Sequence, residues 1–263
     1  MIEARDTGSP EAARKGRGRD FWPADKPGRK APSPKLLLGA AAALVAVVVA
    51  VVAVVMFTGG EDAPPGKPLV PTAFTPDFNG EGFQQIADRS ADRREITAAE
   101  AAAAKKLQSG KYSFTLARSE VTADCKAAAW GTRLQGDLAK FGCTQIVRSA
   151  YVSADKKHVG QFAVANMKNA QGVTQILRDL QTETGAGWLK PLDAKGVPAF
   201  GSGFSAAYAK SYGHYAVITW VERAGGGQPA SLNELIDVSL VIEGAADFLY
   251  GRLDLASNAG AGQ

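Results

Sequence analysis

The sequence predicts an α+β fold in which a mainly antiparallel sheet carries helices packed on one face. Two observations in the second half of the chain lead to this prediction. Segments with alternating apolar and polar residues occur in pairs separated by short polar turns, which is typical of β-hairpins. Between these pairs, apolar residues recur at positions i, i+3, i+4 and i+7, which is typical of amphipathic helices. The expected order is β-α-β-β-α-β-β-α, behind one or two leading helices.

An apolar segment begins at Leu36 and ends at Phe57. Its 22 residues, 36–57, include no charged side chain, no polar side chain and no proline. An α-helix of this length spans roughly 30 Å, which is the thickness of the hydrocarbon core of a bilayer. We therefore expect one transmembrane helix in contact with the lipid bilayer. Small residues spaced by four, such as Gly39 and Ala43, are compatible with a weak homodimer through this span.

The charges on the two sides of this segment predict its orientation. Residues 1–35 carry nine Lys or Arg and five Asp or Glu, whereas Glu61 and Asp62 follow the segment. The positive-inside rule then places the N-terminus in the cytoplasm and the C-terminal domain outside the plasma membrane. The apolar region is too long for a cleaved signal peptide, so we expect an uncleaved signal-anchor. The charges beyond residue 35 cancel, so the basic pI gives no reason to expect a nucleic-acid partner.

Composition divides the rest of the chain. Residues 1–35 mix charged residues with Gly, Pro, Ser and Ala without an apolar period, and we expect them to be disordered. Residues 58–82 are rich in Pro and Gly, which predicts a semi-rigid stalk. Residues 83–255 form the expected α+β domain, which is long enough to bury a core. Residues 256–263 are expected to be a disordered tail.

The first elements of the domain are predicted from helix caps and periodicity. A short helix is expected at its start, and a capping box at Thr97 and Glu100 opens a second helix that ends before Ser109. Residues 111–121 alternate between apolar and polar side chains, which predicts a strand. Apolar residues on one helical face then predict a helix over residues 130–141.

The remaining elements follow from the same patterns. In chain order they are strands over 144–153 and 158–166, a helix over 170–183, a Gly-rich loop over 185–203, strands over 204–210 and 215–223, and a helix from 231 to 253. The last helix opens with a capping box at Ser231 and Glu234. Because apolar residues also alternate over 235–243, a strand there is the alternative.

Two cysteines, Cys125 and Cys143, lie on the side that we expect to be outside, where disulfides persist. One straight helix over residues 125–142 would hold them roughly 27 Å apart, whereas a disulfide needs Cα atoms about 5.5 Å apart. A disulfide within the chain therefore requires this segment to break, most simply at Gly131 or Gly136. Unpaired cysteines and a disulfide between two chains are the alternatives.

No motif in the sequence predicts a catalytic residue, a cofactor or a metal ion. His158 and His214 lie at or near predicted hairpin turns, without a second histidine or cysteine at ligand spacing. A role in the turns is therefore expected for both, rather than metal binding or acid–base catalysis. No serine lies in a G-x-S-x-G pattern, and no two carboxylates stand out as a pair. We do not expect an enzyme.

Residues 188–220 contain several aromatic residues and glycines. Rigid aromatic rings beside flexible glycines suit a groove for a ligand or a partner. The aromatic residues on predicted strands are expected to fill the core. Trp188, Tyr212 and His214 lie in predicted loops, and they are therefore the candidate binding surface.

Two segments of the chain are CKAAAWGTRLQGDLAKFGCTQIVRSAYVSADKKHVGQFAVANM, which begins at Cys125, and GHYAVITWV, which begins at Gly213. Together they resemble a domain of uncharacterised actinobacterial single-pass membrane proteins. The resemblance extends over roughly residues 110 to 250. It implies an extracytoplasmic α+β domain behind one span, with the two cysteines as a recurring pair. It implies no activity and no functional residue.

These observations predict a bitopic protein of the cell envelope. Its outer domain is expected to be a non-catalytic module that binds an envelope protein partner or senses a ligand. One alternative is a cell-wall-acting hydrolase, which requires two carboxylates or a serine and a histidine to converge in a cleft. Another is a structural subunit of a membrane complex, which would expose an apolar face of several hundred Å² or more.

Overall fold

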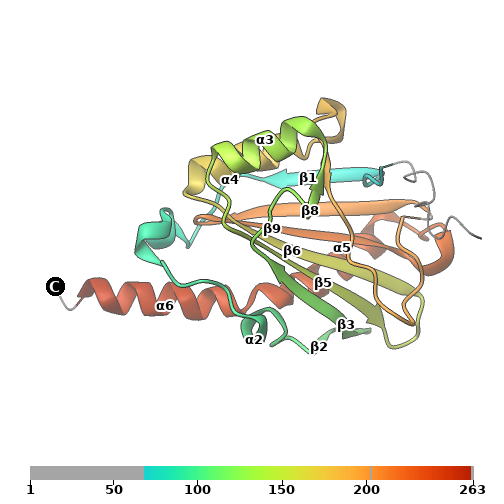
Figure 1. Ribbon diagram of the computed structural model, residues 1–263. Coiled ribbons are helices and arrows are strands. Elements are labelled where there is room, and N and C mark those ends of the chain that lie inside the picture. The colour runs from blue at the N-terminus through green and yellow to red at the C-terminus, as the bar shows by residue number, and fades with distance from the viewer. Residues whose placement is uncertain (1–67, 202, 262–263) are drawn as a thin grey trace, which may run out of the picture. The chain divides into compact units, whose positions relative to one another are not determined.

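The computed structural model describes residues 68–201 and 203–261 (Figure 1). The predicted tail over 1–35, the predicted transmembrane helix over 36–57 and the stalk up to residue 67 lie outside the described residues. Within the part of the chain that is described, no helix has the length and apolar character that crossing a bilayer requires.

A seven-stranded sheet forms the centre of the domain, with the strand order β1-β8-β9-β6-β5-β3-β2 (Figure 1). Neighbouring strands are antiparallel except at one edge, where β1 runs parallel to β8. The strands are β1 (Ala73–Asp77), β2 (Lys106–Ser109), β3 (Tyr112–Thr122), β5 (Gln145–Ser153), β6 (His158–Asn166), β8 (Ser205–Tyr212) and β9 (Tyr215–Arg223).

Helices cover both faces of this sheet. On one face α5 packs against β9, β6 and β3, and on the other face α4 packs against β8 and β9 with α3 beside it. The helices are α2 (Ala98–Ala101), α3 (Thr132–Lys140), α4 (Ala170–Asp179), α5 (Leu232–Glu243) and α6 (Phe248–Ala261). A small two-stranded sheet of β4 (Ala129–Trp130) and β7 (Trp188–Leu189) lies on the side of α3.

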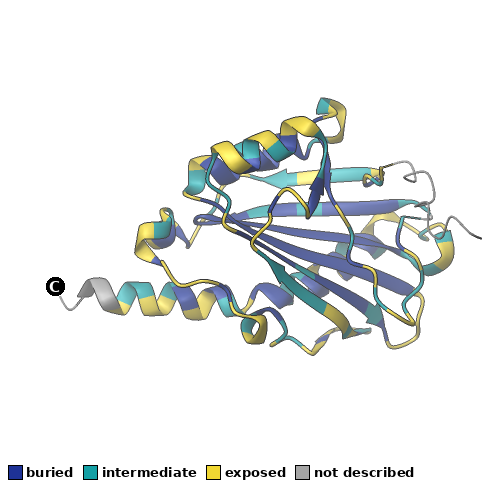
Figure 2. Ribbon diagram, viewed as in Figure 1, coloured by how far each residue is buried: buried dark blue, intermediate teal, exposed yellow. Residues whose placement is uncertain are grey.

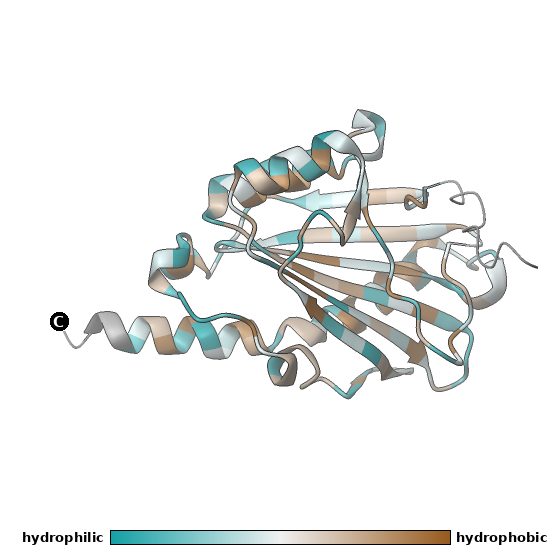
Figure 3. Cartoon of the chain, viewed as in Figure 1, coloured by the Kyte–Doolittle hydropathy of each residue, from teal (hydrophilic) through white to brown (hydrophobic). Residues whose placement is uncertain are grey.

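The prediction that helices cover one face only is therefore wrong. Every residue of β6 is buried, so this strand has no solvent face. Successive side chains enter opposite cores, as when Phe162 faces the α5 core and Ala163 faces the α3–α4 core. Figure 2 shows the central strands as buried and the outer sides of α3 and α6 as exposed, and Figure 3 shows apolar residues gathered on the same central strands.

For the longer elements, the predicted order from the first long strand onward is confirmed as β3-α3-β5-β6-α4-β8-β9-α5, but the two-residue strands β4, before α3, and β7, before β8, were not predicted. Two predictions about the start of the domain are wrong. Residues 73–77, assigned to the stalk, form β1 at the edge of the sheet, so the fold begins before residue 83. The helix that the capping box opens is only one turn long, because the chain turns back and buries Leu107 from β2 in the α5 core.

The C-terminal part of the chain is helical further than predicted. Residues 235–243 lie in α5, which settles the alternative of helix or strand in favour of helix. A 3₁₀ turn over Gly244–Ala246 then separates α5 from α6, so the expected single helix is interrupted. The prediction of a disordered tail from residue 256 is wrong, because α6 continues to Ala261. The other 3₁₀ turns are Gln84–Ile86, Arg89–Ala91, Thr182–Thr184 and Ala224–Gly226.

A buried arginine attaches α6 to the start of the domain. The Arg252 side chain is 2% exposed, and it donates to both carboxylate oxygens of Glu100 at 3.0 and 2.9 Å and to Asp92 at 3.0 Å. It also donates to the backbone carbonyls of Arg94 and Glu95. Tyr215 on β9 donates to Asp92 at 2.8 Å. Burial alone would raise the pKa of Asp92, but the hydrogen bonds from Tyr215 and Arg252 hold that pKa below its usual value.

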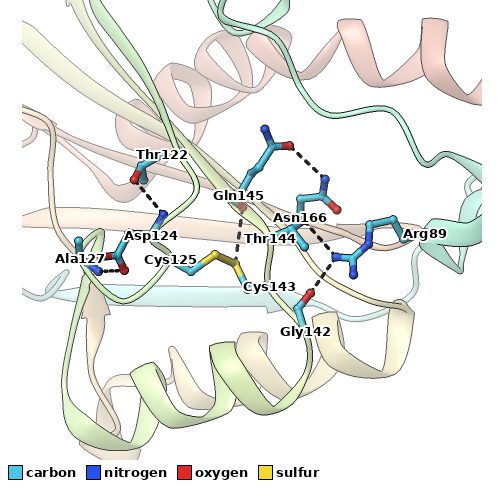
Figure 4. Close-up of a disulfide and its surroundings, with 10 residues drawn as sticks. All are labelled: Arg89, Thr122, Asp124, Cys125, Ala127, Gly142, Cys143, Thr144, Gln145 and Asn166. Atoms are coloured by element: carbon cyan, nitrogen blue, oxygen red, sulfur yellow. Dashed lines mark hydrogen bonds between the residues drawn. A yellow bond between two sulfur atoms is a disulfide. The ribbon is translucent and has the colours of Figure 1, made fainter.

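Cys125 and Cys143 form a disulfide within the chain, with Cα atoms 6.4 Å apart (Figure 4). This confirms the intramolecular pairing among the three alternatives. The segment breaks at Gly131, where φ is +92° and from which α3 begins, whereas Gly136 lies inside α3. A side chain at Gly131 would also collide with the backbone, because a Cβ there would lie 2.3 Å from the carbonyl oxygen of Ala186.

Candidate binding groove along α5

The three residues of the predicted binding surface are buried, and they do not lie together. Trp188 is fully buried in the α3–α4 core, where its ring contacts Phe74 and Trp220 edge-on. Tyr212 belongs to the opposite core, and its hydroxyl donates to Glu243 at 2.7 Å. The prediction of a shared exposed surface is therefore wrong. Its physical reason is that residue 188 joins a strand of the small sheet instead of an open loop.

His214 is fully buried in the tight turn between β8 and β9. Its Nδ1 atom lies 2.7 Å from the carbonyl oxygen of Ile86, and its ring stacks at a tilt on Tyr215. Burial lowers the pKa of His214. The expected role of this histidine in the hairpin turn fits this position, since it joins the turn to the 3₁₀ turn Gln84–Ile86, which lies between β1 and α2.

Two adjoining cavities lie along α5, on the side that faces the turn between β2 and β3. The cavities have volumes of about 410 and 400 Å³ and share Lys111, Tyr112 and Asp237. We call the first the polar pocket and the second the Leu240 pocket, and the two together the α5 groove. Other residues of the polar pocket are Asp155, Lys157, His158, Arg223, Ser231 and Glu234, and those of the Leu240 pocket are Ser109, Gly110, Leu240 and Val241.

A histidine and a glutamate from distant parts of the chain meet in the polar pocket. His158 is the first residue of β6, and Glu234 lies in the first turn of α5. The Nε2 atom of His158 lies 2.6 Å from Oε1 of Glu234. Arg223, at the end of β9, places its Nε atom 3.2 Å from the same oxygen, and the backbone N–H of Ala230 donates to the other oxygen at 2.8 Å.

These donors determine the charge state of Glu234. Burial by itself raises the pKa of this carboxyl, but the hydrogen bond from His158, the Ala230 N–H and the Arg223 charge lower the pKa below its usual value. Glu234 is therefore an anion at neutral pH, and Nε2 of His158 carries the proton that it donates.

The second nitrogen of His158 has no partner. Nδ1 is buried and makes no hydrogen bond within the described residues, although the ring lines the polar pocket. The side chain is only 6% exposed. The ring of Tyr112 meets it edge-on at a centroid distance of 5.6 Å. A buried ring nitrogen without a hydrogen-bond partner is uncommon.

The Leu240 pocket has a different character. Leu240 is 56% exposed on the outer side of α5, and Val241 is 5% exposed beneath it. The remaining wall comes from the turn at Ser109 and Gly110. The α5 groove therefore joins a charged end, near the start of the helix, to a more apolar end about one and a half turns further along.

Two opposite charges at the junction of the pockets have no ion-pair partner among the residues described. Arg223 pairs with Glu234, and Lys157 pairs with Asp155 at 3.8 Å. Lys111 lies with its ammonium 5.1 Å from the centroid of the Tyr112 ring and pairs with no carboxylate in the described part of the chain. Asp237 is exposed and likewise forms no ion pair there.

A second cluster of titratable groups joins α3 to α4. Asp179 is fully buried, and one of its oxygens accepts from Gln175 at 3.1 Å and lies 3.2 Å from Arg133. The other oxygen makes no hydrogen bond within the described residues. Burial and the neighbouring Asp137 raise the pKa of Asp179 to about 6. No cavity accompanies this cluster among those found along the described chain, so we treat it as a feature of stability.

The sequence identified parts of the α5 groove but not the groove itself. Ser231 and Glu234 were expected as a capping box, and Ser231 does accept the Glu234 N–H at 3.4 Å. The Glu234 carboxylate, however, reaches Ala230 and His158 instead of the N–H of Ser231. The spacing of Glu234 and Asp237 on one helix face was the only local signal for a charged wall.

The arrangement suits binding by charge and hydrogen bonding. Within the described residues, no group of three or more His, Cys, Asp or Glu side chains has the geometry to hold a metal ion. Comparison of the chain with protein-family models, curated proteins and solved structures gives no match.

Proposed function

We propose that this chain is a single-pass protein of the cell envelope, anchored in the plasma membrane with its N-terminus in the cytoplasm. Its folded domain lies outside and acts as a non-catalytic binding module that recognises an envelope partner or a ligand. The α5 groove is the binding site. The observation that carries the proposal is that this groove combines an exposed leucine, Leu240, with two opposite charges, Lys111 and Asp237, that have no ion-pair partner within the described residues.

The location outside the membrane is supported by three features of the chain. Residues 36–57 are long and apolar enough for a transmembrane helix, and the preceding residues carry the basic excess expected of the cytoplasmic side. The Cys125–Cys143 disulfide is typical of proteins in oxidising compartments. A disulfide of this kind would not persist in a reducing cytoplasm.

Binding is favoured over catalysis by the way the reactive groups of the groove are occupied. The Glu234 carboxylate accepts from His158, Arg223 and the Ala230 N–H, so it is already satisfied as an anion. Ser231 caps α5, and its hydroxyl oxygen accepts a backbone N–H. A general base needs a free nitrogen or oxygen within reach of its substrate, whereas Nδ1 of His158 is screened from solvent.

The proposal is tested by site-specific crosslinking of the full-length protein in living cells. A photo-reactive phenylalanine is placed at Leu240 in the groove and, as the matched control, at Lys140 on α3 across the sheet. If the groove binds a protein, illumination yields a discrete crosslinked species from position 240 and none from position 140. Equal crosslinking from both positions, or none from either together with no ligand in the small-molecule test below, would contradict the proposed binding site.

The orientation is tested separately with the same protein. Cysteine variants in residues 1–35 and in the exposed loop at Lys126 are treated with a thiol reagent that does not cross membranes. We expect labelling of position 126 in intact cells and labelling of the N-terminal positions only after lysis. The opposite pattern would overturn the proposed topology without affecting the α5 groove.

A further inference from the structure

We propose that the α5 groove binds a small zwitterion with an apolar side chain, of the size of an amino acid or a dipeptide. This inference rests on the proposed function, because it names the class of ligand for the same groove. Two features of the groove support it: the two opposite charges without an ion-pair partner among the described residues, and the division of the groove into a polar and a more apolar pocket.

The charge pattern at the junction matches a molecule with one positive and one negative group. Four of the charged side chains around the polar pocket neutralise one another in the pairs Arg223–Glu234 and Lys157–Asp155. Among the described residues this leaves one cation, Lys111, and one anion, Asp237, and both line both pockets. A ligand with a carboxylate and an ammonium group satisfies both, whereas an ion of a single sign leaves one of them uncompensated.

The two charges at the junction set the orientation of the ligand. The Asp237 carboxylate accepts from the ammonium group of the ligand, and the Lys111 ammonium donates to its carboxylate.

The Leu240 pocket accounts for the apolar side chain. Leu240 and Val241 provide apolar surface directly beside the charges at the junction. A side chain that leaves the junction in this direction covers Leu240, and the gain follows from the apolar surface removed from water. The combined size of the pockets, about 410 and 400 Å³, is in the range of small-molecule sites.

The test is calorimetric titration of the purified full-length protein in detergent with leucine. Glycine, leucinamide and N-acetylleucine serve as comparison ligands, and leucylglycine tests the dipeptide size. We expect saturable binding of leucine, and about tenfold or greater loss for the amide and the acetylated compound, since each lacks one charge. Glycine is expected to bind more weakly than leucine by a similar factor, because it lacks the apolar contact.

Matched variants locate the binding to the groove. Asp237→Asn and Lys111→Gln are expected to weaken leucine binding about tenfold, whereas Asp254→Asn and Lys126→Gln, which change exposed charges elsewhere, leave it within about twofold. Leu240→Ala is expected to abolish the preference for leucine over glycine. Leu232→Ala, at the other exposed leucine of α5, is expected to retain this preference. All six side chains are exposed, so the variants are expected to fold, and their thermal melts verify this.

The outcomes separate this inference from the proposed function. The inference of a zwitterionic ligand would be overturned if neither leucine nor leucylglycine bound. It would also be overturned if leucinamide bound as tightly as leucine, or if the Asp237 and Lys111 variants kept the wild-type affinity for leucine. If crosslinking at Leu240 still captured a discrete partner, the groove would remain a binding site with a macromolecular occupant. If neither experiment found an occupant, both proposals would fall.

Discussion

Replacing Arg252 tests whether the buried ion-pair network holds α6 on the domain. We choose Arg252→Met because methionine keeps much of the length and volume of the side chain while it removes the charge and the donors. The change leaves Asp92, which is 3% exposed, without the guanidinium, although Tyr215 and Arg94 still bind it. Glu100 is partly exposed and can turn to water.

The expected loss follows from these partners. Removal of one member of a buried pair costs about 3–5 kcal/mol when the other member is left unpaired. Because two of the donors to Asp92 remain, we expect the lower end, about 3 kcal/mol of the free energy of unfolding. For a domain of this size, that corresponds to a midpoint of thermal unfolding lowered by about 6–12 °C.

The assay is urea unfolding followed by tryptophan fluorescence, with differential scanning calorimetry as the second measurement. Asp92→Asn in the Arg252→Met background removes the charge that the first change leaves behind, so the double variant should recover part of the loss. Arg252→Lys should fall between the wild type and Arg252→Met, because lysine keeps the charge but cannot bind Glu100 through two parallel donors. A loss below about 1 kcal/mol for Arg252→Met would refute the reasoning.

Three further predictions concern stability. Reduction of the Cys125–Cys143 disulfide, or serine at both positions, should cost about 3 kcal/mol; urea unfolding with and without reductant measures this, and equal midpoints would contradict it. Burial and the neighbouring carboxylate of Asp137 raise the pKa of Asp179 from 3.8 to about 6. The contribution of Asp179 to the free energy of unfolding is therefore fully present below pH 4 and is lost as the pH rises to 6, by at most about 3 kcal/mol. Asp179→Asn should abolish this decrease between pH 4 and 7, and a variant with the same pH dependence as the wild type would be the opposing result. Gly131→Ala should destabilise the domain by more than about 2 kcal/mol, because φ is positive at this residue and the added Cβ collides with a backbone carbonyl. Gly136→Ala inside α3 should be neutral or stabilising by up to about 1 kcal/mol. Thermal melts of the two variants measure this difference.

Local patterns predicted the elements that need no distant partner to be recognised. The hairpin of β5 and β6 and the helix α4 follow directly from alternation and helical spacing. The capping box at Thr97 and the side-chain cap at Ser231 start helices as expected, although Glu234 does not complete a capping box with Ser231. The edge strand β1 could not be predicted in this way, because its partner is β8 and its residue Pro76 is tolerated only at an edge.

The arrangement of helices on both faces depends on contacts that alternation does not report. Gly160 in β6 lets α5 approach closely, since a Cβ there would lie 2.8 Å from Ile242. The α5 groove could not be predicted from the sequence for a similar reason. Glu234 was visible as a helix cap, but its partner His158 is 76 positions earlier in the chain. Only the folded sheet brings these two residues together.

The parallel pairing of β1 with β8 bears on the order in which the chain becomes structured during synthesis. The backbone bond between Thr72 and Ser205 joins residues separated by 133 positions. The N-terminal strand of the domain is thus made first and receives its partner only after four other strands of the sheet have been made. Closure of so long a loop is slow compared with hairpin formation. Until that closure, the outer edge of β8 is open to strands of other chains, so the yield of folded protein should fall as the concentration of newly made chains rises.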